Sequence, residues 1–408
     1  MKSIRNKLSL ATCSLLSAGN AAAEAIENAW EVDGSYLHYS EDERVTVNKL
    51  IGSAKGFVSN KDTATIQVVF DSMSGATPTG AVKNANPLTS TGASGGTGPT
   101  GGGTAAPLAE FDDTRVAVAL DWQHEHNRTF NMNYNGAFSV ENDWRSLSAA
   151  VTANKETKSR STKFTVGAAV TYDEIWRKGS TTTPEPLSRV ADNLFRGTGE
   201  RTSTDLIAGI ATVINRRTVA QFNLAYGLAN GYMTDPYKIF SIVDENGIEW
   251  DQYYEGRPDS RMRYSITAKL NHQTFPGNNN IHLAYRYYGD DWDVKSHTLD
   301  YKHRFNFANS HYLEPRLRYY AQTKAEFYQN SFVAPNNPNL PLNLPQYLSA
   351  DYRLDDMNSV TGGFTYGIPF RNDADLRTRL EYMSQKFDNS EFDTNKALIF
   401  QISYGKRF

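Results

Sequence analysis

Residues 396–408 read KALIFQISYGKRF, and their side chains alternate between apolar and polar character. One face of an extended strand would carry four apolar side chains, interrupted only by Lys406: Phe400, Ile402, Tyr404 and Phe408. The other face would carry Gln401, Ser403, Gly405 and Arg407. Successive side chains of a strand point to opposite faces, and helical spacing does not fit this order. This segment is therefore predicted to be a β-strand with one apolar and one polar face.

The same alternation returns along most of the chain, most clearly at 116–122, 281–287, 299–307 and 313–321. Counting such segments predicts about sixteen strands, with fourteen as the second choice. We expect these strands near 29–39, 43–52, 62–71, 113–124, 128–139, 142–154, 160–174, 203–214, 217–229, 261–272, 280–289, 293–307, 311–323, 355–368, 374–386 and 396–407.

The connections between the expected strands differ in length. Those near 126–127, 155–159, 216, 275, 308 and 373 are short, whereas those near 72–112, 175–202, 230–260 and 324–354 are long. If the N-terminus is periplasmic, the long connections all lie outside, as in single-chain membrane barrels. This agreement favours an even number of strands.

Length and hydropathy point to a membrane barrel. The chain has 408 residues, but no segment approaches the roughly 18 to 20 consecutive apolar residues of a membrane-spanning helix. A closed barrel is the other structure that pairs every backbone group inside hydrocarbon. We therefore expect an all-β, antiparallel, up-and-down transmembrane barrel over residues 24–408. The net charge of −3 carries no large basic field, so no nucleic-acid partner is expected.

The first 23 residues resemble a secretory signal. Lys2, Arg5 and Lys7 precede the mildly apolar stretch 8–18, and Ala21-Ala22-Ala23 supplies small residues for cleavage. Cys13, the only cysteine, lies inside this segment, so the cleaved chain would hold no disulfide or thiolate site. The alternative is a lipoprotein signal, because residues 10–13 read LATC and loosely resemble a lipobox.

The chain ends on Phe408, and its alternating last strand resembles the terminal signature of bacterial outer-membrane barrels. This resemblance implies the outer membrane of a Gram-negative bacterium, with membrane lipid, lipopolysaccharide and the barrel-assembly machinery as partners. The alternative is an ordinary amphipathic edge strand in a soluble β-sandwich.

Several further segments resemble the outer-membrane barrel family known as domain of unknown function 3570. The opening near 30–45, the motif DSMSGATPTGA at 71–81, and segments within 231–261, 285–298, 314–322 and 349–354 carry the likeness. In the motif at 71–81, Met73, Ser74, Thr77 and Thr79 replace the usual residues. The matching loop residues include Asp71, Gly75, Ala76, Pro78, Gly80, Asp235, Pro236, Tyr237, Lys238, Arg257, Pro258 and Asp259. The resemblance implies an outer-membrane barrel and no particular substrate.

Residues on the polar faces are expected to line the lumen. They are Arg286, Asp300, Lys302, Arg304, Glu314, Arg316, Arg318, Arg377, Arg379 and Glu381. Basic groups outnumber acidic ones in this set, so a water-filled pore with such a wall would favour anions. The alternative is a packed, salt-bridged interior with no conducting path.

Other candidate sites are weaker, and no metal or cofactor is expected. Asp290, Asp291 and Asp293 share one turn that could hold Ca²⁺ or bridge lipopolysaccharide through a divalent ion, but a solvated turn is favoured. Ser296 and His297 invite comparison with barrel lipases, yet adjacent strand residues face opposite ways. His124 and His126 are interpreted as turn residues, because no third metal ligand is evident.

Two of the expected external loops contain distinctive sequences. The glycine-rich stretch at 95–103 lies in an external loop that is either flexible or folded into the lumen as a constriction. It lacks the GK[ST] order of a phosphate-binding loop. The segments 235–238 and 257–259 are interpreted as a loop clasp, with a ligand-binding rim as the alternative.

The function that these features favour is transport, as a porin-like channel or a substrate-specific conduit gated by loop 72–112 or loop 230–260. The alternative is a structural barrel that holds a periplasmic or surface protein partner. A membrane-embedded hydrolase is the third hypothesis, and no enzymatic activity is expected.

Overall fold

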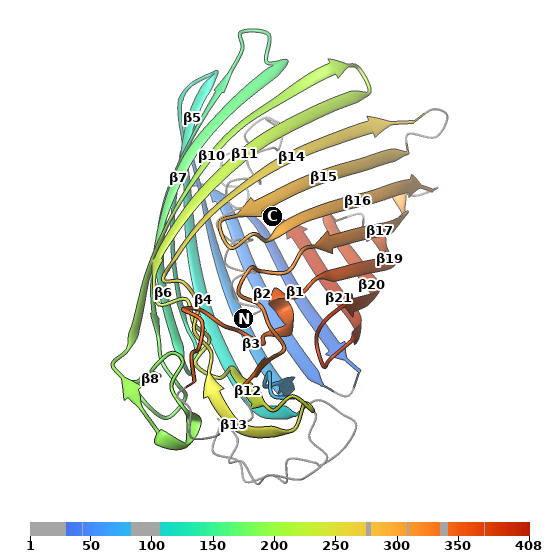
Figure 1. Cartoon of the computed structure of the whole chain (residues 1–408). Helices are drawn as coiled ribbons and strands as arrows, with labels where there is room; N and C mark the ends of the chain where they lie inside the picture. The colour runs from blue at the N-terminus through green and yellow to red at the C-terminus, as the bar shows by residue number, and fades with distance from the viewer. Residues whose placement is uncertain are drawn as a thin grey trace.

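The computed structural model describes residues 30–42, 44–82, 107–274, 279–307, 310–334, 342–370 and 372–408. These residues form a closed antiparallel barrel of 16 strands (Figure 1). The strands are β1 (Trp30–Glu41), β2 (Val45–Phe57), β3 (Asp62–Pro78), β4 (Leu108–Asn127), β5 (Phe130–Val140), β6 (Trp144–Glu156), β7 (Thr162–Ile175), β10 (Gly199–Asn215), β11 (Thr218–Gly231), β14 (Ser260–Gln273), β15 (Asn280–Asp290), β16 (Lys295–Asn306), β17 (Tyr312–Gln322), β19 (Met357–Pro369), β20 (Ala374–Phe387) and β21 (Thr394–Arg407). The predicted strand count is confirmed.

The alternation of side chains places apolar groups on the outside of the barrel. Leu50, Leu120 and Leu147 are 55, 59 and 60% exposed, whereas Asp71 and Asp173 are only 3 and 2% exposed. This arrangement reverses that of a soluble protein and is the one expected where the outer face contacts lipid. We refer to the side of the wall opposite the exposed apolar side chains as the inner face.

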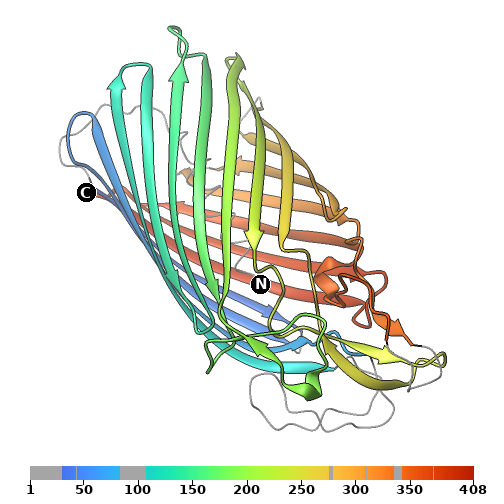
Figure 2. The ribbon, with the colours of Figure 1, turned by 60° about the vertical axis from the view of Figure 1, so that its left-hand side comes forward.

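The barrel closes where the first and last strands meet. β1 pairs with β21 in an unbroken antiparallel register from Glu31 with Arg407 to Glu41 with Ala397. Closure leaves no open edge in the barrel sheet, so each of its sixteen strands has two neighbours. Figure 2 shows that the teal and green strands run nearly upright while the orange and red strands run nearly across the view, so the direction of the strands changes strongly around the wall.

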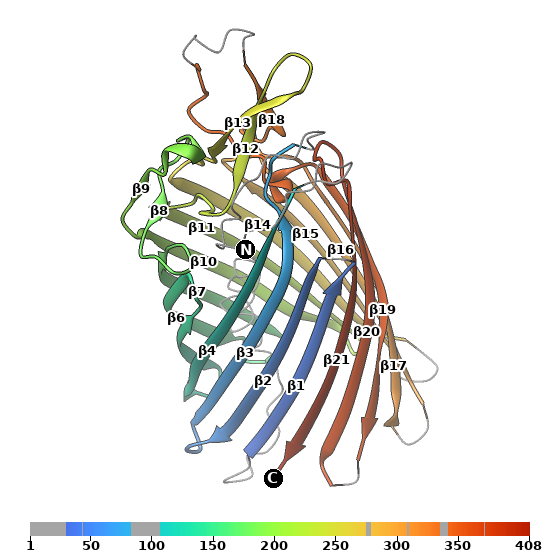
Figure 3. The same cartoon turned by 90° about the horizontal axis from the view of Figure 1, so that it is seen from below.

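The connections sort by length between the two ends of the barrel. The long connections gather at one end, while the C-terminus lies at the other (Figure 3). They contain short elements: β8 (Thr183–Pro184), η1 (Val190–Asp192), β9 (Phe195–Arg196), β12 (Ile239–Val243), β13 (Glu249–Tyr254), β18 (Ser331–Val333) and η3 (Tyr352–Leu354). We call this the long-loop end, which is external in the orientation usual for such barrels.

One expectation about the loops needs correction. The first loop was expected over 72–112, but β3 continues to Pro78 and β4 begins at Leu108, and the two pair along this extension. The long connections also contain regular structure, because β12, β13 and β18 form a three-stranded sheet. Its apolar cluster contains Phe240, Ile242 and Leu348, which are fully buried. Burial of these side chains gives the long loops a small hydrophobic core of their own.

Among the described residues, no helix is long and apolar enough to cross a membrane. The expected signal segment 1–23 and the glycine-rich stretch 95–103 lie outside the described residues, so both remain predictions.

Candidate functional site

The register places the ten predicted lumen residues on the inner face. Arg316, for example, pairs with Lys302 on β16 and with Gly363 on β19, while its neighbour Leu317 is an exposed residue of the outer face. The remaining members alternate with outward-facing residues in the same way: Arg286, Asp300, Arg304, Glu314, Arg318, Arg377, Arg379 and Glu381.

Several of these residues form ion pairs along the wall. The Arg316 Nε donates to Asp300 Oδ2 at 3.1 Å, and its Nη1 donates to Glu381 Oε1 at 3.1 Å. Lys302 lies 3.8 Å from Glu314. The charges that the sequence suggested as a basic surface are therefore partly neutralised by carboxylates on nearby strands.

Two other arginines of the predicted lumen set have aromatic or amide partners. The Arg304 guanidinium lies 3.5 Å from the centre of the Tyr312 ring, and its Nε donates to Asn306. Arg286 lies 5.5 Å from the centre of the Tyr288 ring. An arginine on an aromatic face is held in one orientation by the ring.

Three arginines reach across a whole strand to their carboxylates, and each crosses at a glycine. Arg316 on β17 crosses β19 at Gly363 to reach Glu381 on β20. Arg263 on β14 crosses β11 at Gly227 to reach Asp205 on β10, with 3.1 Å between Nη2 and Oδ1. Arg377 on β20, whose register partner on β21 is Ser403, runs diagonally past Gly405 to reach Asp33 on β1. We call these the glycine-spanning ion pairs.

The glycines leave the space that these side chains occupy. A Cβ atom at Gly227 would lie 2.7 Å from Arg263 Nε and closer still to Asp205 Oδ1. A Cβ atom at Gly405 would lie 3.1 Å from Asp33 Oδ2 and 3.3 Å from Arg377 Nη2. The paired groups therefore lie flat against the backbone of the middle strand.

Further ion pairs of the inner face join adjacent strands. The Arg115 guanidinium on β4 lies 2.6 Å from Asp71 on β3, and Lys49 on β2 lies 3.3 Å from the same carboxylate. Arg201 on β10 lies 2.6 Å from Asp173 on β7. All the ion pairs named here run along the wall, between neighbouring strands or strands one apart, and not across the barrel.

A second cluster of charges lies at the long-loop end, where parts of three connections meet: 77–82, 232–259, and 323–334 with 342–356. We call these segments the loop cap. Its charge cluster consists of three carboxylates and three cations: Asp235, Lys238, Glu255, Arg257, Asp351 and Arg353. The predicted loop clasp over 235–238 and 257–259 is part of this cluster.

Arg257 joins two connections of the loop cap. Its Nη2 lies 2.7 Å from Glu255 Oε1 and donates to Asp351 Oδ2 at 2.7 Å. Arg353 Nε donates to Asp351 Oδ1 at 2.6 Å, and its Nη2 donates to Asp235 Oδ2 at 2.9 Å. Asp351 is fully buried. The carboxylate of Asp351 therefore ties the connection before β19 to the connection before β14.

Lys238 joins the same cluster to the end of β3. Its Nζ donates to the Pro78 carbonyl oxygen and lies 3.4 Å from Thr77 Oγ1. The next backbone contact is between Ile239 N and the Thr79 oxygen, at 3.1 Å. Gly80 has a φ of +101°, and a Cβ atom there would collide with the Ile239 carbonyl oxygen. A glycine is thus needed where this chain segment crosses the start of β12.

The electrostatics of the cluster are strongly shifted by burial. Burial and the nearby Arg353 lower the pKa of Lys238 to about 8, although Asp351 and Asp235 oppose the shift. Burial alone would raise the pKa of Asp351, but Arg353, Arg257 and Lys238 more than offset it, so this pKa lies well below its usual range. Asp351 therefore stays ionised at any physiological pH.

The turn with three aspartates differs from the expectation of a solvated turn. Asp290 accepts hydrogen bonds from Arg261 Nε at 2.9 Å, from the Tyr288 hydroxyl at 2.7 Å, and from the backbone N–H groups of Trp292 and Val294. Its side chain is completely buried. Asp293 instead pairs with Lys295, so the carboxylates do not converge on one point.

One acidic group escaped the sequence reasoning. Asp113, Glu141 and Asp143 offer carboxylate oxygens that all lie within 4.8 Å of one another, the one such group among the described residues. Burial, together with the nearby Asp113 carboxylate, raises the pKa of Asp143 to about 6. Carboxylate oxygens at this spacing could hold a divalent cation. The available signal was the pair of acidic positions 141 and 143 in the connection between β5 and β6, together with Asp113 on the neighbouring strand β4.

The histidines and Ser296 make simple contacts. His297 Nδ1 lies 2.7 Å from the Tyr285 hydroxyl on the outer face, whereas Ser296 is buried on the inner face. His124 contacts Asp62 at 2.7 Å, and the ring of His126 stacks on Phe130. None of these contacts assembles the nucleophile and base of a hydrolase.

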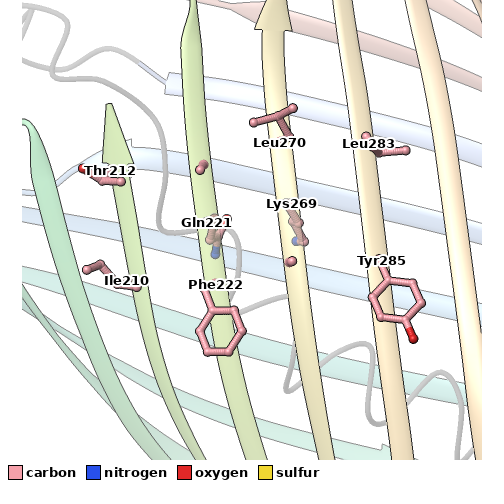
Figure 4. A pocket seen from close by; sticks show the side chains of 10 residues that line it. Ile210, Thr212, Gln221, Phe222, Lys269, Leu270, Leu283 and Tyr285 are labelled. Atoms are coloured by element: carbon pink, nitrogen blue, oxygen red, sulfur yellow. The ribbon is translucent and has the colours of Figure 1, made fainter. Parts of the chain in front are cut away.

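The outer face also has shallow depressions. One, of about 370 Å³, lies between Ile210, Phe222, Leu283 and Tyr285 (Figure 4). These four side chains belong to the exposed apolar set. The depression therefore faces the lipid side of the wall.

A closed barrel with an apolar outer face and an ion-paired inner face defines an outer-membrane-type β-barrel protein. The chain belongs to the family described as protein of unknown function (DUF3570), whose profile matches residues 5–399. No curated protein matches the chain.

Solved outer-membrane structures resemble it at low identity. The siderophore receptor PirA from Acinetobacter baumannii is 9% identical, with a TM-score of 0.44, over 90% of this chain and 54% of the receptor. This chain thus spans about half the receptor's length. A bacterial polysaccharide outer membrane secretin is 9% identical, with a TM-score of 0.46, over 94% and 98% of the two chains. The outer membrane protein opdK from Pseudomonas aeruginosa is 8% identical, with a TM-score of 0.42, over 94% and 99%.

Proposed function

We propose that this protein is a porin-like transport conduit in the outer membrane of a Gram-negative bacterium. The observation that carries the proposal is the arrangement of the ion pairs, which lie along the inner face. Charged side chains that pair across a barrel would fill it, whereas pairs held along the wall leave the middle of the barrel to water. Barrels with about sixteen strands usually enclose such a space.

The inner face supports passage of hydrophilic solutes. Its charged side chains come from strands all around the barrel, including Arg115 on β4, Arg201 on β10 and Arg377 on β20. A wall of this kind stabilises water and ions, which an apolar wall would exclude. The conduit would therefore take small polar or charged solutes.

The loop cap narrows the external mouth in this proposal. Loop 230–260, expected as a gate, is tied to the connection before β19 through the buried Arg257–Asp351 ion pair and the partly buried Arg353–Asp235 pair. It is tied to the end of β3 through the hydrogen bond from Lys238 to the Pro78 carbonyl oxygen. Buried ion pairs resist separation because an isolated charge left in a low-dielectric site is costly. The loop cap would therefore act as a fixed constriction rather than as a freely moving lid.

The partners follow from the same proposal. The apolar outer face would contact membrane lipid and lipopolysaccharide, and the alternating last strand would be read by the barrel-assembly machinery after cleavage of the signal segment. Phe408 is available for such a contact, because its side chain is largely exposed while its backbone N–H donates to the Trp30 oxygen.

The test is single-channel conductance of the purified barrel in a planar bilayer. Folding is first verified by the heat-dependent shift in gel mobility that closed barrels show. Discrete conductance steps in KCl are expected from the folded protein and not from the heat-denatured sample. A folded barrel that never conducts would remove the conduit from consideration.

A further inference from the structure

We infer that three carboxylates, Asp205, Glu381 and Asp33, set the charge selectivity of the conduit by holding Arg263, Arg316 and Arg377 flat against the wall. The inference rests on the proposed function and adds its selectivity-determining residues. An arginine side chain is long and flexible enough to point its guanidinium away from a wall when no carboxylate holds it. Each carboxylate therefore acts as a positioning residue for one arginine.

The register supports this role. Each of the three pairs joins strands that are not neighbours, so the guanidinium must extend sideways over the strand between them. At all three crossings that strand presents a glycine on the inner face: Gly227, Gly363 and Gly405. Glycine weakens a strand interior and often marks a place where another group approaches closely. At Gly227 and Gly405 the approaching groups are the paired side chains themselves, whereas at Gly363 they are the backbone of β20 and the side chain of Glu381.

The three arginines differ in whether another carboxylate still pairs with them after the positioning carboxylate is removed. Arg316 keeps Asp300, and Arg377 keeps Asp375 at 2.7 Å. Arg263 has Asp205 as its ion-pair partner, and its register partner on β15, Asp290, already accepts from Arg261 and Tyr288. The side chains of Arg263 and Asp205 are 14 and 29% exposed, so this pair faces solvent only in part. Arg263 is therefore the arginine most completely released by a single substitution.

The primary variant is Asp205→Asn, which keeps the shape and removes the charge. A guanidinium freed about 10 Å from the solute path should raise the Cl⁻ to K⁺ permeability ratio about two- to fourfold at moderate salt. The ratio is read from the reversal potential in a KCl gradient. The double variant Asp205→Asn with Arg263→Gln should return the ratio to the starting value.

A change of net charge would also shift selectivity, so a second variant separates charge from position. Gly227→Ala alters no charge, but its methyl group occupies the space of the Arg263 and Asp205 side chains. The control is Gly136→Ala on the outer face of β5, a glycine-to-alanine change inside a barrel strand where an added Cβ atom meets nothing within 4 Å. Gly227→Ala should move the ratio in the same direction as Asp205→Asn, and Gly136→Ala should leave it unchanged.

A readout that needs no conduction keeps this inference distinct from the proposed function. Phenylglyoxal reacts with accessible guanidinium groups, and peptide mass spectrometry locates the modified arginine. Arg263 should react severalfold faster in both Asp205→Asn and Gly227→Ala than in the wild type or in Gly136→Ala. Equal labelling of Arg263 in all four folded proteins, or an unchanged permeability ratio in Gly227→Ala, would overturn the inference. A wild type that does not conduct but shows the expected labelling would instead overturn the conduit and leave the position of Arg263 established.

Discussion

The substitution Asp351→Asn should open the loop cap while leaving the barrel closed. Asp351 is fully buried and accepts from two guanidinium groups, those of Arg257 and Arg353. Breaking a buried ion pair by removing one partner costs about 3–5 kcal/mol. Arg353 is partly exposed and keeps Asp235, and an asparagine retains one oxygen, so we expect about 2–4 kcal/mol. This free energy belongs to the loop cap, because the barrel strands make none of these contacts.

Hydrogen exchange measures this local opening directly. The amides of Gly256 and Leu348 donate to each other's carbonyl oxygens across the loop cap, each at 2.9 Å. A loss of about 2–4 kcal/mol corresponds to exchange about 30- to 1,000-fold faster at these two amides. Amides in the strand pair β20 and β21 should exchange at the wild-type rate.

The control for this experiment is Asp293→Asn, which removes an exposed carboxylate paired with Lys295. Exposed pairs contribute about 0–1 kcal/mol, so little change is expected at either set of amides. The reasoning would be refuted if Gly256 and Leu348 kept their protection in Asp351→Asn. It would equally be refuted if the barrel amides lost protection together with them, since the loop cap would then not be a separate unit.

Three further predictions concern the same structure. Protection of the loop-cap amides from hydrogen exchange, corrected for the intrinsic exchange rate, should rise about tenfold or more between pH 7 and 9.5. The reason is that Lys238 has a pKa of about 8 when the loop cap is closed and about 10.4 when the side chain is solvated. In that window the open state binds more protons, so rising pH favours the closed state; Lys238→Gln should abolish the trend. Gly80→Ala should weaken the loop cap by about 2 kcal/mol or more, since its Cβ atom would strike the Ile239 carbonyl oxygen. Gly179→Ala is also at positive φ but in open space, so it should cost only about 1 kcal/mol of strain. Thermal denaturation, monitored by proteolysis of the loops, measures both losses. Deletion of Phe408 should lower the amount of barrel in outer-membrane fractions without changing its synthesis, as quantified by immunoblot, and a level equal to wild type would contradict a role of the terminal residue in assembly.

The strands of the barrel could be predicted because each one carries its own two-residue period. Lipid on one face and the barrel interior on the other impose the same alternation on every segment, so Leu299 or Tyr319 is recognisable without knowledge of its neighbours. The ends of β3 and β4 were missed for a local reason. Gly75 and Pro78 are typical of loops, but here they extend a strand pair that the partner strand holds in register.

The contacts within the candidate site could not be predicted in the same way. Asp205, Gly227 and Arg263 lie on three different strands, and only the register of those strands brings them into one row. Likewise, Lys238 meets Pro78 across a separation of 160 residues. The local sequence of either segment does not predict which other segment it will contact.

The sequence by itself determined that this chain forms an outer-membrane-type barrel of about sixteen strands with its long connections at one end, because the alternation of side chains is local and repeats in every strand. The tertiary structure alone decided which charges neutralise one another, over which glycines they pass, and which loops are tied together. An ion pair depends on distance in space, and distance in space is fixed by strand register and loop packing rather than by the period of any one segment.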